Sequence, residues 1–281
     1  MRRWALGLVG SPVSHSLSPT LHAAAFASTG LVGSYTAFEA PDAAARDVAL
    51  ARLRHGALDG LNVTIPWKTA VVERCDQLSG DAAQLGAINT VVRATDGSLT
   101  GHNTDVSGLR AALAEAGVAA LDGRPCAVIG AGGAARAALC VAARLGAGEV
   151  RVWNRTADKA EAVTRALGVG RVVAELAEAL EGAALVLQAS ASGMDLGAAE
   201  TQELAAELTP GLQRTSPEAH VCDLVYRPRR TAWVLAAEAA GRRGQDGLAM
   251  LVHQAAEAFR LWTGARPDAV AMRMAAEART R

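Results

Sequence analysis

The sequence predicts an α/β protein built from two α/β domains, of which the second is Rossmann-like. Short apolar runs alternate with longer segments rich in alanine, leucine, glutamate and arginine along the whole chain. The 281 residues are sufficient for two cores of ordinary size. A glycine-rich loop also joins an apolar run to an alanine-rich segment near the middle of the chain.

The first domain is predicted to comprise residues 1–105 together with residues 246–281. Apolar runs predict strands at residues 4–10, 34–40 and 58–64, and a strand, an Asp96-Gly97 turn and a short return strand within residues 86–105. Helices are predicted at residues 18–30, with Ser18 as N-cap and Pro19 at the first helical position, at residues 42–55, and from Pro66 onward.

The second domain is predicted to comprise residues 106–245. An amphipathic helix at residues 104–118 leads into it. A strand, glycine loop and helix then follow at residues 126–147, with further strands at 149–154, 184–190 and 220–225. Two final helices are predicted at residues 246–264 and 267–279. The face LAMLVHQAAEAF is too apolar to be exposed, so these helices are expected to pack on the first domain.

Composition and charge exclude several classes of protein. The 28 basic and 28 acidic residues balance, so no net charge attracts nucleic acid or an anionic membrane surface. The four cysteines are scattered without a C-x-x-C pair, which predicts reduced thiols and no metal site. No apolar run is long enough to span a membrane, and MRRWALGLVGSP is interpreted as a strand start and not as a secretory signal, so a cytoplasmic location is expected.

The glycine loop, VIGAGGAARAA, places Gly130, Gly132 and Ala135 in a G-x-G-x-x-A frame between a strand and a helix. Gly130 permits a tight turn, Gly132 permits close approach of a pyrophosphate to the backbone, and Ala135 permits close packing of the helix on the strand. The helix N-terminus adds amide donors and a positive dipole end. In this context the loop indicates a dinucleotide site.

The next strand indicates which dinucleotide is bound. It ends in VWNRTADK, with Asn154, Arg155 and Thr156 and then Lys159, where NAD-binding domains place an acid that binds the ribose 2′-hydroxyl. A guanidinium, a hydroxyl and an amine suit a 2′-phosphate instead, with Arg155 as the bidentate partner. NADP is therefore predicted in preference to NAD.

Four polar clusters of the first domain, SHSLSP, NVTIPWK, GAINT and GHNTD, lie at strand–helix junctions, where open α/β sheets place ligand groups. Each also has a purely local interpretation. Ser18 and Asp105 could cap helices, and Asn62 and Thr64 could satisfy nearby backbone. Lys68 could be the first exposed residue of a helix or a reagent at the mouth of a pocket.

The motifs SHSLSP, NVTIPWK, AINT, HNTD, GAGGAAR, NRT, DLVY and DGLAMLVHQA, in this order, resemble those of the shikimate dehydrogenase family over essentially the whole chain. The resemblance implies NADPH-dependent reduction of 3-dehydroshikimate to shikimate, on the route to aromatic amino acids, with substrate and NADP meeting between the domains. It implies that Lys68 and Asp105 are the catalytic pair. The substrate residues it implies are Ser16, Ser18, Thr64, Lys68, Asn89, Asp105, Tyr226 and Gln254. The NADP residues it implies are Gly130, Ala131, Gly132, Gly133, Ala134, Asn154, Arg155, Thr156, Lys159, Leu224, Gly247 and Met250.

The sequence also departs from the family pattern. Gln188 and Ser190 stand in QASASG where the family usually has N-A-T, Ala249 replaces a glycine, and Lys159 replaces a frequent arginine. His102 stands where an acid is common, and its side chain is expected to be exposed. The alternative is that His102 is itself a pH-sensitive neighbour of Asp105. Two rival functions remain: a quinate/shikimate dehydrogenase that uses NAD, and a non-catalytic ligand sensor. A monomer or a homodimer is expected.

Overall fold

The computed structural model describes residues 2–194 and 196–280. The chain divides into two compact units: unit 1 spans Met1–Gly108 and Leu251–Arg281, and unit 2 spans Leu109–Met250. The unit boundaries fall a few residues beyond those expected from the sequence, because they lie inside two helices, α4 (Asp105–Glu115) and α10 (Leu248–Thr263). Each unit is a mixed α/β structure, as the sequence predicts.

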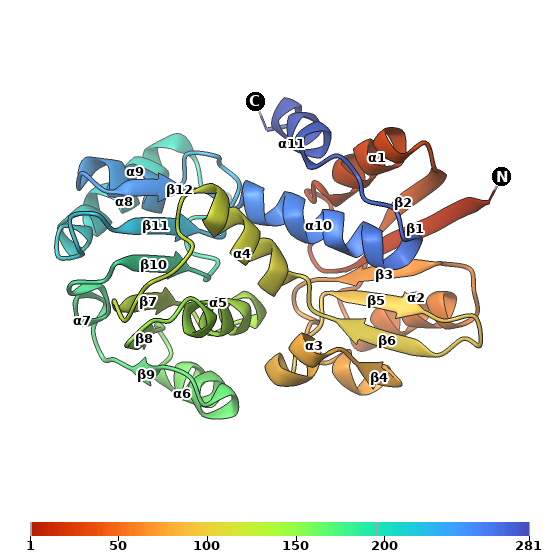
Figure 1. Cartoon of the computed structure of the whole chain (residues 1–281), viewed down its shortest axis with the longest axis horizontal. Coiled ribbons are helices and arrows are strands. Elements are labelled where there is room, and N and C mark those ends of the chain that lie inside the picture. Colours follow the sequence, from red (N-terminus) through yellow and green to blue (C-terminus); the bar gives the residue numbers. More distant parts are fainter. Residues whose placement is uncertain (1, 195, 281) are drawn as a thin grey trace. The chain divides into compact units, whose positions relative to one another are not determined.

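Unit 1 contains a mixed sheet of strand order β2-β1-β3-β5-β6-β4 (Figure 1). Its strands are β1 (Arg3–Gly10), β2 (Val32–Glu39), β3 (Gly60–Val63), β4 (Gln77–Leu78), β5 (Thr90–Arg93) and β6 (Leu99–His102). Strands β1, β2 and β3 are parallel, whereas β5 is antiparallel to both β3 and β6. Its remaining helical segments are α1 (Ser18–Thr29), α2 (Ala43–Arg54), η1 (Val72–Arg74), α3 (Gly80–Leu85) and α11 (Ala269–Ala278).

The expected return of the C-terminal helices to the first domain is confirmed. Helix α11 packs on α1, and on α10 the indole Nε1 of Trp262 donates to the carbonyl of Val91 on β5 at 2.9 Å. Gly60 on β3 lets the ring of Trp262 approach, since a Cβ there would lie 2.3 Å from the indole. The burial of this large aromatic side chain ties the end of the chain to the sheet that carries the polar clusters.

The prediction that a helix begins at Pro66 is wrong. Residues 65–71 form turns after a cis Ile65–Pro66 bond and lead into the 3₁₀ helix η1. The carbonyl of Lys68 accepts from the N–H of Ile88 at 2.8 Å, so it is committed to another segment and not to the N–H of Val72. A continuous α-helix needs that i to i+4 bond. The segment is therefore held by tertiary contacts.

The assignment of Ser18 as an N-cap is also wrong. Ser18 is the first residue of α1, and the capping position belongs to Leu17, which has no side-chain acceptor. The hydroxyl of Ser16 accepts from the N–H of Ser18 at 3.2 Å and so satisfies one of the free amides at the start of the helix. Pro19 follows inside the first turn, where its missing N–H costs nothing.

Unit 2 contains a parallel sheet of strand order β12-β11-β10-β7-β8-β9. Its strands are β7 (Cys126–Ile129), β8 (Val150–Trp153), β9 (Arg171–Val172), β10 (Leu185–Gln188), β11 (His220–Asp223) and β12 (Arg243–Gln245). Its helices are α5 (Gly133–Arg144), α6 (Ala157–Leu167), α7 (Leu176–Leu180), α8 (Ala198–Leu212) and α9 (Ala232–Ala239), together with most of α4. This is the doubly wound order of dinucleotide-binding folds, whose ligands bind where the strand order reverses, here between β7 and β10.

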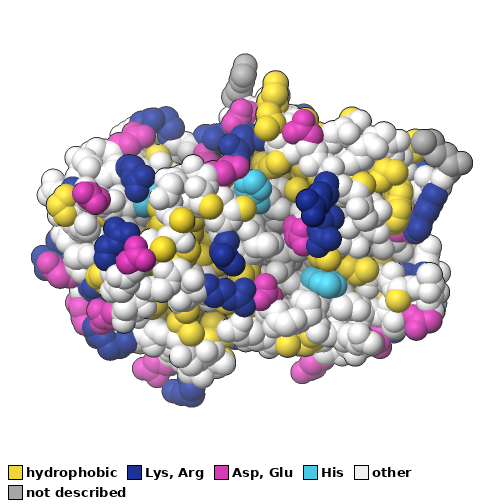
Figure 2. Space-filling view, in the orientation of Figure 1, with side chains coloured by type: hydrophobic (Ala, Val, Ile, Leu, Met, Phe, Trp, Pro, Cys, Tyr) yellow, Lys and Arg dark blue, Asp and Glu magenta, His cyan; other side chains and the backbone are white. Residues whose placement is uncertain are grey.

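The described part of the chain contains no helix long and apolar enough to cross a membrane and no group of side chains that could hold a metal ion. The cysteines are free thiols, as expected, and all but the half-buried Cys75 are buried. On the face shown in Figure 2, basic and acidic side chains are interspersed, with no large area of one sign.

Candidate active site

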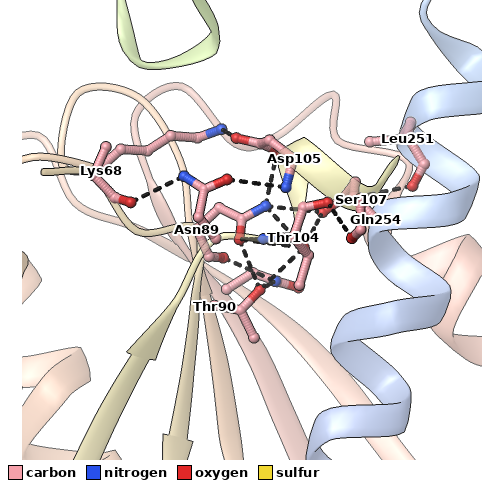
Figure 3. Close-up of polar contacts among 11 residues, drawn as sticks. Lys68, Asn89, Thr90, Thr104, Asp105, Ser107, Leu251 and Gln254 are labelled. Atoms are coloured by element: carbon pink, nitrogen blue, oxygen red, sulfur yellow. Dashed lines mark hydrogen bonds and ion pairs between the residues drawn. The ribbon is translucent and has the colours of Figure 1, made fainter. Parts of the chain in front are cut away.

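The centre of the candidate site in unit 1 is an ion pair between Lys68 and Asp105. The Lys68 Nζ donates to Asp105 Oδ2 at 2.6 Å, and the two side chains point at each other in Figure 3. The Asp105 side chain is only 5% exposed and that of Lys68 is 16% exposed. Lys68 is therefore not a surface helix residue. The pair is mostly shielded from water, yet the amine can still be reached.

Asn89 holds the Asp105 carboxylate from the other side. Its Nδ2 donates to Asp105 Oδ1 at 2.8 Å, while its Oδ1 accepts from the N–H of Thr104 at 2.8 Å. Gln254, on α10, places its Oε1 3.4 Å from the same Asn89 nitrogen, and its Nε2 donates to the carbonyl of Leu251 (Figure 3). Asp105 is thus oriented by side chains as well as paired, and it is the first residue of α4.

Three neighbouring strands bring these residues together. Asn62 lies near the end of β3, Asn89 directly precedes β5, and the N-T-D turn follows β6. Because β3, β5 and β6 are adjacent in the sheet, side chains from separate segments of the sequence lie within hydrogen-bond distance of one another. Thr64 follows β3 directly and is half-buried, and its N–H donates to the carbonyl of Val9 at 2.9 Å.

Ser16 and Ser18 form a small polar group at the start of α1. The Ser16 hydroxyl lies 3.1 Å from that of Ser18, and Ser18 is buried. Two hydroxyls beside the free amides of a helix N-terminus favour an anion.

The glycine turn of unit 2 follows β7 as predicted. Gly130 has φ 118°, which a residue with a side chain rarely adopts, and a Cβ there would lie 2.8 Å from the backbone nitrogen of Ser190. Gly132 caps α5 without a side-chain hydrogen bond, and a Cβ at Gly132 would meet no atom within 4 Å. Ala131 and Gly133 to Ala134 complete the turn and the first residues of α5. The open backbone and the N-terminal amides of α5, which no side chain caps, fit a pyrophosphate.

The residues predicted to bind the 2′-phosphate follow β8. They lie next to the glycine turn, because the N–H of Gly130 donates to the carbonyl of Trp153, the last residue of β8, at 2.8 Å. Asn154 Nδ2 donates to the carbonyl of Thr156 at 2.8 Å and closes the loop before α6. Arg155, Thr156 and Lys159 are exposed there. Two exposed cations beside a pyrophosphate-binding turn suit an additional phosphate.

The residues predicted to border the nicotinamide, and Tyr226, which is predicted to bind the substrate, follow β11 and β12. Leu224 and Tyr226 follow β11, and Gly247 approaches Leu224 so closely that a Cβ there would lie 2.2 Å from the Leu224 carbonyl oxygen. Met250 follows on α10 and is buried. Only glycine fits at residue 247 without moving the segment that follows β11.

Gln188, the departure at the end of β10, shapes the loop that follows it. Its Nε2 donates to the carbonyls of Ser190 and Ser192 at 3.2 and 3.0 Å, and its Oε1 accepts from the N–H of Ser190 at 2.8 Å. The side chain is fully buried. The side chain of Gln188, which is longer than the asparagine of the family pattern, therefore fixes the loop after β10. Residue 190 of this loop lies against Gly130. Nothing in the structure distinguishes Ala249 from the glycine it replaces.

His102 is half-buried, so the expectation of an exposed side chain is wrong. Burial lowers the pKa of His102. The negative charge of Glu257 on α10 acts to raise this pKa, and the positive charge of Arg260 acts to lower it further. Its carbonyl accepts from the N–H of Asn89 at 3.0 Å, so its backbone helps to place the site.

Tyr35, Thr90 and Thr104 were missed as site residues by the sequence reasoning. Tyr35 donates to Asn62 Oδ1 at 2.7 Å, and the Thr90 hydroxyl donates to Asn89 Oδ1 at 3.0 Å. Tyr35 gives no signal in the sequence, because it lies within an ordinary strand pattern far from the polar motifs. Thr90 and Thr104 belong to the AINT and HNTD motifs and could have been included with them.

Models of known families match the two ends of the chain. Residues 8–91 match the shikimate dehydrogenase substrate binding domain, and residues 247–277 match the shikimate 5′-dehydrogenase C-terminal domain. Among curated proteins, the shikimate dehydrogenase (NADP⁺) of Thermococcus kodakarensis is 42% identical over 272 residues, which cover 96% of this chain and 94% of that protein.

Solved structures of similar proteins share the fold. A shikimate 5-dehydrogenase from Thermus thermophilus, in complex with NADP(H) and shikimate, superposes with a TM-score of 0.84 at 39% identity, covering 98% of this chain and 99% of that one. A quinate dehydrogenase from Corynebacterium glutamicum, in complex with NAD, superposes with a TM-score of 0.83 at 31% identity, covering 99% of this chain and 100% of that one.

Proposed function

Because this chain belongs to the shikimate dehydrogenase family, we propose that it catalyses the NADPH-dependent reduction of 3-dehydroshikimate to shikimate, a step towards aromatic amino acids. The observation that carries the proposal is the pair of Lys68 and Asp105, joined at 2.6 Å and oriented by Asn89. A non-catalytic sensor has no need of a shielded acid–base pair. The expected monomer or homodimer stays a prediction.

The chain's own part in the reaction is to move one proton. Bound NADPH supplies the hydride to the ketone carbon, and the ketone oxygen must gain a proton as its charge develops. Lys68 Nζ holds hydrogens that can be donated to this oxygen, and Asp105 fixes the amine in position. In the reverse direction Lys68 takes the hydroxyl proton. Such acid–base assistance contributes about 10²–10⁴-fold in rate.

The polar residues of unit 1 fit a ring that carries hydroxyls and a carboxylate. Ser16 and Ser18 are proposed to bind the carboxylate through their hydroxyls and the start of α1. Thr64, Asn89, Asp105 and Gln254 are proposed to bind the ring hydroxyls, and Tyr226 stays a predicted substrate residue. A site built from such donors and acceptors rejects an analogue that leaves them unpaired.

Unit 2, residues 109–250, is proposed as the NADP-binding domain. The glycine turn from Gly130 to Ala134 would bind the pyrophosphate, and Asn154, Arg155, Thr156 and Lys159 would bind the 2′-phosphate and its ribose. Leu224, Gly247 and Met250 would border the nicotinamide. Unit 1 is proposed as the substrate domain.

The nearest alternative is oxidation of quinate or shikimate with NAD, since a quinate dehydrogenase shares the fold over the whole chain. The end of β8 argues against this alternative because positions 154–156 hold Asn, Arg and Thr and no acid for a free 2′-hydroxyl.

The deciding experiment measures NADPH or NADH formation by the purified protein with shikimate or quinate and with NADP or NAD. We expect the highest kcat/KM with shikimate and NADP. Preference for quinate and NAD would establish the alternative, and binding without turnover over a broad pH range would establish the sensor.

A further inference from the structure

Tyr35 on β2 occupies a position that the proposed reaction does not explain. Its ring stacks on the imidazole of His22 with centroids 4.2 Å apart and planes within 8°. His22 is fully buried on α1, and burial lowers the pKa of His22 to about 3, so the imidazole stays neutral. Tyr35 itself remains half-buried, and burial raises the pKa of its phenol, which therefore keeps its proton.

The direction of each hydrogen bond beyond Tyr35 follows from counting donors. Asn62 Nδ2 donates to the carbonyl of Asn89 at 2.9 Å and to the Thr90 hydroxyl at 3.0 Å. A carbonyl can only accept, so the nitrogen of the Asn62 amide must face it and the oxygen must face Tyr35. The Tyr35 phenol then has to donate, as its 2.7 Å contact with Asn62 Oδ1 indicates.

The same counting extends to the catalytic pair. The Thr90 hydroxyl accepts from Asn62 and donates to Asn89 Oδ1 at 3.0 Å, which is nearer than the Thr104 hydroxyl at 3.4 Å. Asn89 Nδ2 in turn donates to Asp105 Oδ1. All donors from Tyr35 onward therefore point the same way, towards the carboxylate that holds Lys68. Chains of aligned hydrogen bonds polarise one another, and a single reversed member breaks the alignment.

We propose that Tyr35 is a positioning residue of this active site, which fixes the amide of Asn62 and, through Thr90 and Asn89, the orientation of the Asp105 carboxylate. The ring of Tyr35 also stacks on His22, so one side chain contacts both α1 and the network of the catalytic pair. This inference rests on the proposed dehydrogenase function and adds to it a residue that no motif marks.

Loss of the phenol hydroxyl has a specific structural consequence. Without a donor at its oxygen, Asn62 is held only through its nitrogen, by the Asn89 carbonyl and the Thr90 hydroxyl, so its amide is positioned less firmly against Thr90. Asn89 keeps the bond from the Thr104 N–H, so its orientation is weakened and not lost. We therefore expect Tyr35→Phe to lower kcat for shikimate about tenfold, within the range for an unsatisfied buried acceptor.

The test compares wild type, Tyr35→Phe, Thr90→Val and the double variant in shikimate oxidation with saturating NADP. The phenylalanine keeps the ring stacked on His22, and valine keeps the shape of threonine. If Tyr35 acts through Thr90, the double variant loses no more activity than Thr90→Val alone. Losses that multiply would overturn the proposal. The exposed Ser34→Ala, on the same strand, is the matched control and should behave as wild type.

A second measurement separates positioning from mere stability. Tyr35→Phe should keep its KM for NADP within about twofold of wild type while kcat falls. A lower Tm with unchanged kcat would mean that Tyr35 only supports the fold, and the proposal would fail. An inactive wild type would instead refute the dehydrogenase function, so the two failures are distinguishable.

Discussion

Replacing Lys68 with methionine tests the assigned proton carrier most directly. Methionine has nearly the same length and no proton to give, so the segment between β3 and η1 can keep its contacts. These include the bond from the Trp67 indole to the carbonyl of Ala40 at 2.8 Å and the bond from the Ile88 N–H to the carbonyl of residue 68. Neither bond uses the amine of Lys68.

The substitution of Lys68 is expected to affect both kcat and the free energy of folding. Loss of acid–base assistance should lower kcat by about 10²–10⁴-fold, which corresponds to roughly 3–5 kcal/mol in the barrier. The Asp105 carboxylate also loses one charge-assisted hydrogen bond. Such a bond usually contributes about 1.5–3 kcal/mol to the free energy of folding. The Asn89 donor at 2.8 Å remains, so we expect the cost in folding free energy to stay at the lower end. NADP affinity should be unchanged because the glycine turn belongs to unit 2.

The assay is steady-state shikimate oxidation over a range of pH, with NADPH binding followed by fluorescence and Tm by calorimetry. Lys68→Arg serves as the control for charge: the ion pair with Asp105 can persist, but a guanidinium cannot release a proton, so kcat should stay low. Turnover close to that of wild type in Lys68→Met, at any pH, would remove Lys68 from the mechanism.

Three other outcomes follow from the structure. Arg155→Ala should raise the Kd for NADP about tenfold or more and leave that for NAD nearly unchanged; equal losses in a binding titration would show that Arg155 does not contact the 2′-phosphate. Gln188→Ala should free the loop after β10 and weaken NADPH binding while shikimate binding persists; unchanged Kd values for NADPH would contradict this. The buried His22, whose pKa is lowered to about 3, makes stability rise with pH up to about 6.5. Burial raises the pKa of Asp223 to about 7 and adds a slope of the opposite sign from about pH 4 to 7, where the folded state binds the proton and the unfolded state releases it. Asp223→Asn should remove this slope in urea unfolding at pH 5 and 8, since Oδ1 can still accept from the Val225 N–H, and an identical slope in both proteins would exclude Asp223 as its source.

The parts of the fold that the sequence predicts best are those fixed by local rules. The glycine turn is one of them, because its strand, its glycines and the start of α5 are consecutive and each has a backbone reason at its position. The exposed Arg155 and Lys159 follow from their place after β8 in the same way. Where a local rule competed with tertiary contacts, prediction failed. Pro66 should start a helix by propensity, but the carbonyl of Lys68 is bonded to Ile88 instead.

The amino-acid sequence by itself predicted the α/β class and, from the residues that follow the second strand of unit 2, NADP as the cofactor. The pairing of Lys68 with Asp105 was implied by the family resemblance. Only the tertiary structure decided how that pair is held. Asn89, Thr90 and Asn62 reach it from adjacent strands, and Tyr35 joins them from β2 across β1. The reason is that donor direction depends on which groups face each other. The spacing of residues in the sequence does not predict these contacts, because it is the order of the strands in the sheet that brings residues 35 and 105 into one hydrogen-bond network.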